Sequence, residues 1–224
     1  NMDLYAVVFN RTTETDLTED QLPQVDIYKY KQVIFVGDSR TEFMENVLTG
    51  MGESATTNVK FVCSAGKGLD WFTTTGWAQL YSIVQHDSNS ILSKKTAVIF
   101  NFGVNDLSKS ADYAEYYNWI APQLKSKGCE LYFMSVNPVN RLMLPNAGRA
   151  DRSEAAVRSF NQYMKANLSS AYTYIDMYSY LKSTGYSFAS DHYGTGTVDD
   201  GLHYTTRTYK RIFAKCMDSL RVPV

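Results

Sequence analysis

A serine, a histidine and an aspartate in this sequence have the types and spacing of a nucleophile with its base. Ser39 follows a glycine and an aspartate in the tetrapeptide Gly-Asp-Ser-Arg at 37–40. His203 lies near the C-terminal end of the sequence, three residues after Asp200. That spacing lets one short turn bring the carboxylate beside the imidazole, where it would fix the ring tautomer and stabilise the imidazolium. The three side chains therefore predict a serine activated for attack on a carbonyl carbon.

Each of these residues also has an ordinary structural interpretation. A serine after a strand can cap the N-terminus of a helix, so Ser39 alone favours a capping role. The sequence contains three histidines, and a lone histidine is usually a surface residue. His86 ends a helical stretch, and His192 lies in a glycine-rich loop with Asp191 directly before it. Neither histidine has a carboxylate three residues earlier, as His203 has. The spacing therefore indicates His203 as the base.

Asn105 and a glycine-rich loop are candidates to stabilise an oxyanion. Asn105 follows an apolar run and could donate its side-chain amide, although an Asx turn is the simpler interpretation of the segment. In the segment 64–71, Gly66 or Gly68 could offer a backbone N–H at close approach. The spacing of these glycines matches neither a P-loop nor a dinucleotide-binding turn, which disfavours nucleotide binding.

Short apolar runs, typical of strands buried on both faces, precede most of these motifs. The predicted strands are 32–36, 59–63, 97–102, 130–136 and 172–176. Helical stretches alternate with them at 41–49, 71–85, 112–127, 152–168 and 205–220. This alternation predicts an α/β domain with a parallel sheet covered by helices on both faces. Ligands on such a sheet bind outside the carboxyl ends of the strands, where the candidate residues are found.

The bulk composition fits one large globular domain. The chain has 224 residues, of which 44% are hydrophobic and 20% charged. We expect an N-terminal extension over 1–30 and a single catalytic domain over 31–224. The formal net charge of -1 and the lack of a basic stripe argue against a nucleic-acid partner. No apolar run reaches the ~18 residues of a membrane span, so no integral membrane segment is expected in this sequence.

The four motifs, taken in this order, resemble the sequence blocks of the SGNH (GDSL-like) hydrolase superfamily of serine esterases. The resemblance extends from about Val33 to Tyr209. It implies a flavodoxin-like three-layer α/β/α sandwich with a five-stranded parallel sheet. It also implies a catalytic triad of Ser39, Asp200 and His203, without a metal or other cofactor.

The resemblance further assigns an oxyanion hole, and the sequence departs from the family pattern in two places. The donors would be the backbone N–H of Ser39, the side-chain amide of Asn105 and a glycine N–H. The first block reads Gly-Asp-Ser-Arg, with Arg40 where an apolar residue is more common. The second block lacks the usual asparagine, and counting from its position favours Gly68 as the third donor, with Gly66 as the alternative.

The expected reaction is hydrolysis of a carboxylic ester of a small molecule or a glycan. The first and last motifs are similar to those of exported proteins of Gram-positive bacteria, which favours acetyl esters on carbohydrate or cell-wall glycan. Four residues near the motifs are candidates to contact the substrate: Arg40, Trp71, Asn140 and Tyr204. Arg40 could instead pair with the carboxylate of Asp38 or Glu42, and the aromatic rings could fill the core. Two loops, 137–151 and 187–199, are long enough to form walls of a pocket.

Other functions stay open at this point. The same three side chains could transfer an acetyl group to a sugar hydroxyl, or act on lipid esters as a lipase or lysophospholipase does. A non-catalytic glycan-binding module is a further alternative, although it would be expected to lack one of the three side chains. The resemblance favours secretion or display at a bacterial cell surface, with a leader or anchor upstream, and a cytoplasmic location stays open. The sequence predicts neither the acyl chain nor the oligomeric state.

Overall fold

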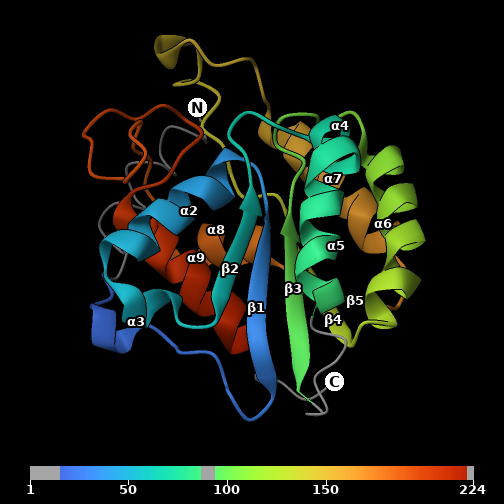
Figure 1. Cartoon of the computed structure of the whole chain (residues 1–224). Coiled ribbons are helices and arrows are strands. Elements are labelled where there is room, and N and C mark those ends of the chain that lie inside the picture. Colours follow the sequence, from blue (N-terminus) through green and yellow to red (C-terminus); the bar gives the residue numbers. More distant parts are fainter. Residues whose placement is uncertain (1–15, 87–93, 221–224) are drawn as a thin grey trace.

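One five-stranded parallel sheet forms the centre of the protein (Figure 1). A computed structural model describes residues 16–86 and 94–220. The strands lie in the order β2-β1-β3-β4-β5, and their bounds are β1 Tyr30–Gly37, β2 Val59–Cys63, β3 Lys95–Asn101, β4 Cys129–Met134 and β5 Tyr172–Ile175. At the carboxyl edge, Gly37 pairs with Cys63 on one side and with Asn101 on the other. The five-stranded α/β fold expected from the sequence is confirmed.

Helices cover both faces of the sheet and give the protein three layers (Figure 1). On one face lie α2, α8 and α9, and on the other lie α5, α6 and α7. The α-helices are α2 Ser39–Gly50, α3 Glu53–Thr56, α4 Leu69–Trp71, α5 Trp77–His86, α6 Ser110–Lys125, α7 Glu154–Asn167, α8 Met177–Thr184 and α9 Thr206–Ser219. A wide π turn, Phe72–Gly76, joins α4 to α5, and short 3-10 turns lie at Glu19–Gln21 and Pro145–Ala147.

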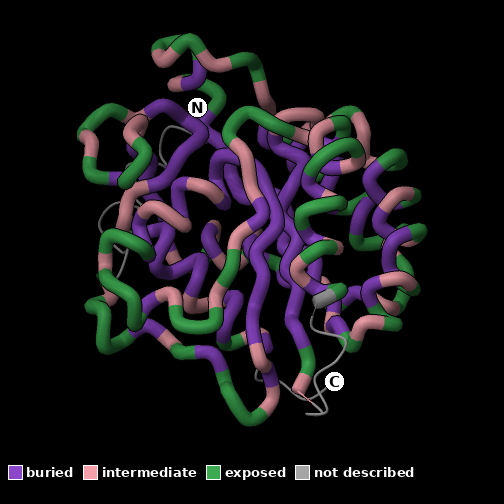
Figure 2. The backbone as a smooth tube through the Cα atoms, viewed as in Figure 1, coloured by how far each residue is buried: buried purple, intermediate pink, exposed green. Residues whose placement is uncertain are grey.

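The alternation of side chains along each strand produces two hydrophobic layers, one on each face of the sheet. In β1, Val33 and Phe35 pack in the layer of α2 and α9, whereas Ile34 and Val36 pack in the layer of α5, α6 and α7. All four side chains are fully buried. Figure 2 shows the buried backbone running through the strands and along the inner sides of the helices. Burial on both faces explains why the strand has a continuous apolar sequence.

The helices differ from the prediction in three places, of which the first is the four-residue α3, which was not predicted. The helix expected from residue 71 begins at Leu69 and is interrupted by the π turn before α5. Helix α8, which was not predicted, begins directly after β5 because Asp176 caps it. The Asp176 carboxylate accepts hydrogen bonds from the backbone N–H and the hydroxyl of Ser179, at 3.1 and 3.0 Å. Only eight residues long, α8 is too short to produce a clear hydrophobic period.

The described part of the predicted N-terminal extension packs onto the domain. Leu22 and Val25 are buried in the layer of α2 and α9. Lys210 of α9 donates a hydrogen bond to the Leu17 carbonyl. Residues 1–15, the first half of the predicted extension, lie outside the described residues. Within the described ranges, every helix is too short or too polar to cross a membrane.

The position of the hydrophobic core can be tested at Phe100 in β3. Its side chain is fully buried, and its ring centroid lies 4.8 Å from that of Tyr117. Phe100→Ala leaves a cavity, so the free energy of unfolding should fall by about 3–5 kcal/mol. Tyr28→Ala is the control, because Tyr28 is 89% exposed. Its loss should change stability by less than ~0.5 kcal/mol. Urea denaturation measures both variants, and equal effects at the two positions would contradict the core assignment.

Candidate active site

Ser39, His203 and Asp200 form a continuous chain of hydrogen bonds at the carboxyl edge of the sheet. Ser39 Oγ lies 2.9 Å from His203 Nε2, and His203 Nδ1 lies 2.6 Å from Asp200 Oδ2. All three residues are buried, and Ser39 and His203 line a cavity of about 420 Å³, here called the Ser39 cavity. The carboxylate engages Nδ1, which leaves Nε2 to accept the hydroxyl proton.

The turn after β1 places Ser39 at the start of α2. Gly37 is required in this turn, since a Cβ there would lie 2.0 Å from Thr41 Oγ1. The Asp38 carboxylate caps the helix by accepting the backbone N–H of Arg40 at 3.0 Å. Burial raises the pKa of Asp38 to about 6, although the Arg40 charge lowers it. Ser39 is thus fixed as the first residue of a helix, where backbone N–H groups favour a negative charge.

A tight turn holds Asp200 against His203. Asp200 Oδ1 accepts hydrogen bonds from the backbone N–H groups of Leu202 at 2.9 Å and of His203 at 2.8 Å. Gly201 has a φ of 70°, and a Cβ there would lie 2.3 Å from the carbonyl oxygen of Asn140. The backbone N–H of Asn140 donates to the Gly201 carbonyl at 2.8 Å. The turn therefore depends on the loop after β4 as well as on its own hydrogen bonds.

The pKa values of Asp200 and His203 both lie below their usual values, for different reasons. Burial raises the pKa of the Asp200 carboxyl, but the donors from His203 and the backbone outweigh burial and hold it below its usual value. Burial lowers the pKa of the His203 imidazole, and the hydrogen bond to Asp200 offsets only part of that effect. The Phe43 ring stacks on the imidazole, with centroids 4.4 Å apart. The imidazole is therefore neutral at neutral pH and able to accept a proton.

Two neighbours set the orientation of the Asn105 amide. Arg152 Nη2 donates to Asn105 Oδ1 at 2.9 Å, and Asn105 Nδ2 donates to the Lys67 carbonyl at 2.8 Å. Because a guanidinium can only donate, its contact identifies the amide oxygen, and Nδ2 keeps a second N–H beyond its bond to Lys67. Asn105 lines the same cavity as Ser39. Asn105 and the serine are therefore at the wall of one cavity.

The two candidate glycines after β2 occupy different positions. Gly66 lines the Ser39 cavity, and a Cβ there would meet no atom within 4 Å. Gly68 directly precedes α4, and a Cβ there would lie 2.3 Å from Asp106 Oδ2. Asp106 accepts the backbone N–H of Leu69 at 2.9 Å and the hydroxyl of Tyr113 at 2.7 Å. Gly66 is thus the glycine at the cavity wall, whereas Gly68 allows close packing on Asp106.

Strand ends and the two long loops together form the walls of the Ser39 cavity. Its lining residues are Ser39, Phe43, Ala65, Gly66, Asn105, Gly148, Arg149, Ala150, Arg152, Ser190, His192, Leu202 and His203. The loop 137–151 contributes three of these residues and the loop 187–199 contributes two. Among residues 16–86 and 94–220, no three side chains of the metal-binding types are grouped so that they could hold an ion.

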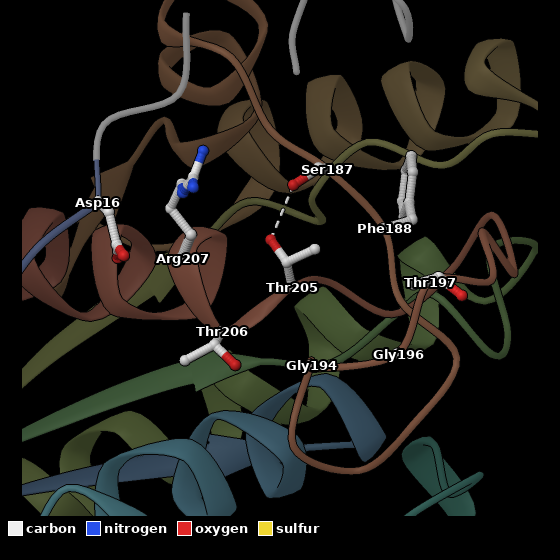
Figure 3. A pocket seen from close by; sticks show the side chains of 9 residues that line it. All are labelled: Asp16, Ser187, Phe188, Gly194, Gly196, Thr197, Thr205, Thr206 and Arg207. Atoms are coloured by element: carbon white, nitrogen blue, oxygen red, sulfur yellow. Dashed lines mark hydrogen bonds between the residues drawn. The ribbon is translucent and has the colours of Figure 1, made fainter. Parts of the chain in front are cut away.

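A second cavity, of about 460 Å³, lies at the start of α9 (Figure 3). The loop 187–199 lines this cavity as well as the Ser39 cavity. In its wall, Ser187 Oγ and Thr205 Oγ1 are hydrogen-bonded to each other at 2.8 Å (Figure 3). Its described lining residues include no histidine. The second cavity is slightly larger, but the hydrogen-bonded Ser39 hydroxyl and His203 imidazole belong to the Ser39 cavity.

The expectation that Arg40 contacts the substrate is wrong, because the chain itself binds its guanidinium. Arg40 is 3% exposed and is absent from the lining of the Ser39 cavity. Its Nε, Nη1 and Nη2 donate at 2.9, 2.8 and 2.8 Å to the backbone carbonyls of Leu202, Asn137 and Pro138. Arg40 therefore joins α2 to two loops.

The other three residues expected to meet the substrate also pack within the protein. Tyr204 is fully buried and donates its hydroxyl to the Pro138 carbonyl at 2.5 Å. Asn140 is 3% exposed and bonds to the turn before α9. Trp71 packs against the core, with its ring 6.1 Å from that of Phe102. None of the three lines the Ser39 cavity, so these expectations are corrected to a supporting role.

Three residues that line the cavity were not expected from the sequence: Phe43, Arg149 and Arg152. Phe43 lies between the rings of His203 and His192, with centroids 4.4 Å from each. Its position one helical turn after Ser39 is a signal that could have indicated it, because such residues share a helix face. The two arginines lie in or beside an irregular loop, where no periodicity indicates direction.

The sequence matches one family over most of its length. Residues 33–216 match the family model described as GDSL-like Lipase/Acylhydrolase. The chain therefore belongs to the GDSL-like lipase/acylhydrolase family, the SGNH hydrolases. A search of curated proteins finds no match to the sequence.

Solved structures share the fold at low sequence identity. A candidate SGNH hydrolase from Slackia heliotrinireducens is 12% identical with a TM-score of 0.59, and the match covers 86% of this chain and 100% of that chain. The acetyl xylan esterase AlAXEase is 12% identical with a TM-score of 0.56, and the match covers 85% of this chain and 100% of that chain. These similarities confirm the expected SGNH hydrolase fold.

The His203 imidazole should titrate below its usual pKa of 6.5, because burial disfavours the imidazolium. Asp200→Asn removes the carboxylate that partly offsets burial, so it should lower the pKa of His203 further. NMR of the ring protons across pH, assigned with a His203→Gln variant, measures both values. A wild-type midpoint at or above 6.5, or a higher midpoint in Asp200→Asn, would contradict this account of the site.

Arg40→Met keeps the length of the side chain but removes the donors to three carbonyls. Leaving buried carbonyls without partners should lower the free energy of unfolding by about 3 kcal/mol or more. Arg141→Met is the control, because Arg141 lies on the surface in an exposed ion pair with Asp151. Such pairs contribute less than ~1 kcal/mol. Chemical denaturation compares the two variants, and a stability loss at Arg40 no greater than at Arg141 would refute the bridging role.

Proposed function

We propose that this chain is a serine esterase that hydrolyses carboxylic esters, and that acetyl esters of carbohydrate or cell-wall glycan are its substrates. One observation carries the proposal: Ser39 Oγ lies 2.9 Å from His203 Nε2 at the wall of a cavity of about 420 Å³. Asp200 binds the other imidazole nitrogen at 2.6 Å. A hydroxyl, an imidazole and a carboxylate in this order are the groups that acyl transfer requires. Membership of a lipase/acylhydrolase family supports the same class of reaction.

In the first half of the reaction, Ser39 Oγ forms a bond to the carbonyl carbon of the ester. His203 Nε2 accepts the hydroxyl proton as the bond forms, and the carbonyl π electrons move onto the oxygen. Asp200 stays ionised and stabilises the imidazolium. The low pKa of the Asp200 carboxyl suits this role, because the group does not compete for the proton.

Three N–H groups are proposed to bind the oxyanion. The backbone N–H of Ser39 lies at the start of α2, and the Asn105 amide lines the same cavity. The third donor is the backbone N–H of Gly68, with that of Gly66 as the alternative. The position of Gly66 at the cavity wall favours the alternative. The Lys67 carbonyl accepts the Asn105 amide, so the Gly68 N–H of the same trans peptide points away from that amide. Such donors stabilise the charge that develops in the transition state.

In the second half, the tetrahedral intermediate collapses and the bond from carbon to the alcohol oxygen breaks. The leaving alcohol takes the proton from His203 Nε2, and the acyl group remains on Ser39 as an ester. Water then attacks the acyl carbon, with His203 accepting its proton. The second collapse returns the proton to Ser39 Oγ and releases the carboxylic acid.

The cavity lining favours a short acyl group on a polar alcohol. Its large apolar side chains, Phe43 and Leu202, lie among small and polar residues, which suits a long lipid chain poorly. The acetyl xylan esterase that shares the fold suggests acetyl xylan as the first glycan to assay. An exported enzyme would reach glycan esters outside the cell, and we propose that location for this protein.

Ser39→Ala removes the nucleophile, so kcat should fall by about 10⁴-fold or more. Ser183→Ala, at an exposed position of α8, is the matched control and should keep full activity. The assay uses para-nitrophenyl acetate, butyrate and palmitate, then acetyl xylan with and without an acceptor sugar. Hydrolysis by Ser39→Ala at the wild-type rate would refute the esterase mechanism. Preference for palmitate would refute the acetyl assignment, and acetyl transfer without hydrolysis would identify a transferase instead.

A further inference from the structure

Two of the three arginines around the Ser39 cavity have a partner within the chain at every guanidinium nitrogen. Each guanidinium nitrogen of Arg40 donates to a backbone carbonyl. Each nitrogen of Arg152 also has a partner, among the carbonyls of Val104 and Ala150 and the Oδ1 atom of Asn105. These two guanidinium groups hold loops together and orient the Asn105 amide. Their bonding is what a structural arginine requires.

Arg149 differs from both, because much of its hydrogen-bonding capacity is unused. Its Nη2 donates to Asp200 Oδ2 at 3.2 Å. Its Nε is buried and has no hydrogen-bond partner in the part of the chain that the structure describes. The side chain is 37% exposed and lines the Ser39 cavity. A guanidinium carries five N–H donors, so Arg149 retains donors for a ligand beside the nucleophile.

The wall of the Ser39 cavity is positively charged. Arg149 and Arg152 belong to it, whereas its described lining contains no aspartate or glutamate. The carboxylate that Arg149 contacts, that of Asp200, is 0% exposed and is already bonded to His203. An anionic group on a substrate would therefore be attracted to this wall and would meet no lining carboxylate.

We infer that Arg149 binds a carboxylate of the substrate while Ser39 attacks the neighbouring ester. The inference rests on the proposed esterase function and narrows its substrate class to acetyl esters of acidic carbohydrate, whose sugar acids carry carboxylates. A guanidinium binds a carboxylate through parallel N–H bonds, which supply charge and direction together. A neutral glycan offers no such group.

The contact between Arg149 and Asp200 has an effect that can be separated from substrate binding. The Arg149 charge acts on the triad, where it contributes to lowering the pKa of His203. This influence is the same for every ester that the enzyme hydrolyses. Only a role in binding makes the Arg149 charge matter more for an anionic ester than for a neutral one. The ratio of kcat/KM for two matched esters therefore isolates the binding role.

The test compares pairs of esters that differ in one carboxylate. With the charge on the alcohol side, the pair is para-acetoxybenzoate and para-acetoxybenzamide. With the charge on the acyl side, the pair is the mono-para-nitrophenyl ester of glutaric acid and para-nitrophenyl pentanoate. The variants are Arg149→Gln, Arg149→Lys and the control Arg141→Gln. Arg141 lies in the same loop, is bonded to Asp151 at the surface and does not line the cavity.

For the alcohol-side pair, wild type and Arg141→Gln should favour the carboxylate ester by about tenfold or more in kcat/KM, as expected for one charge-assisted contact. Arg149→Gln should reduce this ratio to about one, and Arg149→Lys should keep part of it, since the charge is retained. Acetylated polygalacturonate should likewise be preferred to acetylated xylan. A preference confined to the acyl-side pair would overturn the acidic-carbohydrate assignment.

Equal ratios in wild type and Arg149→Gln, or no preference in wild type, would overturn the inference. Binding measured in the Ser39→Ala background keeps this test separate from catalysis. Calorimetry should give a lower Kd for para-acetoxybenzoate than for para-acetoxybenzamide, and Arg149→Gln should remove the difference. Failure of the esterase function itself would appear differently, as absent hydrolysis of the neutral esters. Equal Kd values for the two esters would refute the inference whether or not turnover occurs.

Discussion

The Arg40 guanidinium joins the beginning of α2 to the loops that follow β4 and precede α9. It does so through three buried hydrogen bonds, to the carbonyl of Leu202 and to those of residues 137–138. Ser39 precedes Arg40 and His203 follows Leu202, so the contact that joins the loops also sets the distance from hydroxyl to imidazole. Only a guanidinium presents donors in a planar fork that can serve three carbonyls at once. The bridge thus links the stability of the loops to the geometry of the site.

Burial at this edge of the sheet disfavours the charged form of both Asp200 and His203, yet it affects their pKa values in opposite directions. The Asp200 carboxylate stays charged because His203 and two backbone N–H groups donate to it, which outweighs its loss of solvent. The His203 imidazole stays neutral because Phe43 and the surrounding core disfavour its charged form. A proton taken from Ser39 would create the imidazolium beside a carboxylate already oriented toward it. This arrangement suits the proposed mechanism, in which that charge exists only during reaction.

The sequence predicts the sheet. It also predicts that Ser39, Asn105 and His203 meet at one site. Strands buried on both faces have unmistakable apolar runs, and parallel strands bring their carboxyl ends to one edge. The role of Arg40 could not be predicted, since its place beside Ser39 suggested the substrate while three backbone carbonyls bind it in the interior. Arg149 was missed because distant contacts determine its loop conformation. Helix α8 was not predicted because its two turns are too few to show a helical repeat of hydrophobic residues.

The proposed esterase function requires that His203 activates Ser39 as a nucleophile. A fluorophosphonate, which bonds covalently only to an activated serine, tests this claim without knowledge of the substrate. Mass spectrometry of the labelled protein and its peptides should locate one phosphonyl group on Ser39, and His203→Gln should slow labelling by orders of magnitude. Label on another serine, or labelling of Ser39 at an unchanged rate in His203→Gln, would contradict the account.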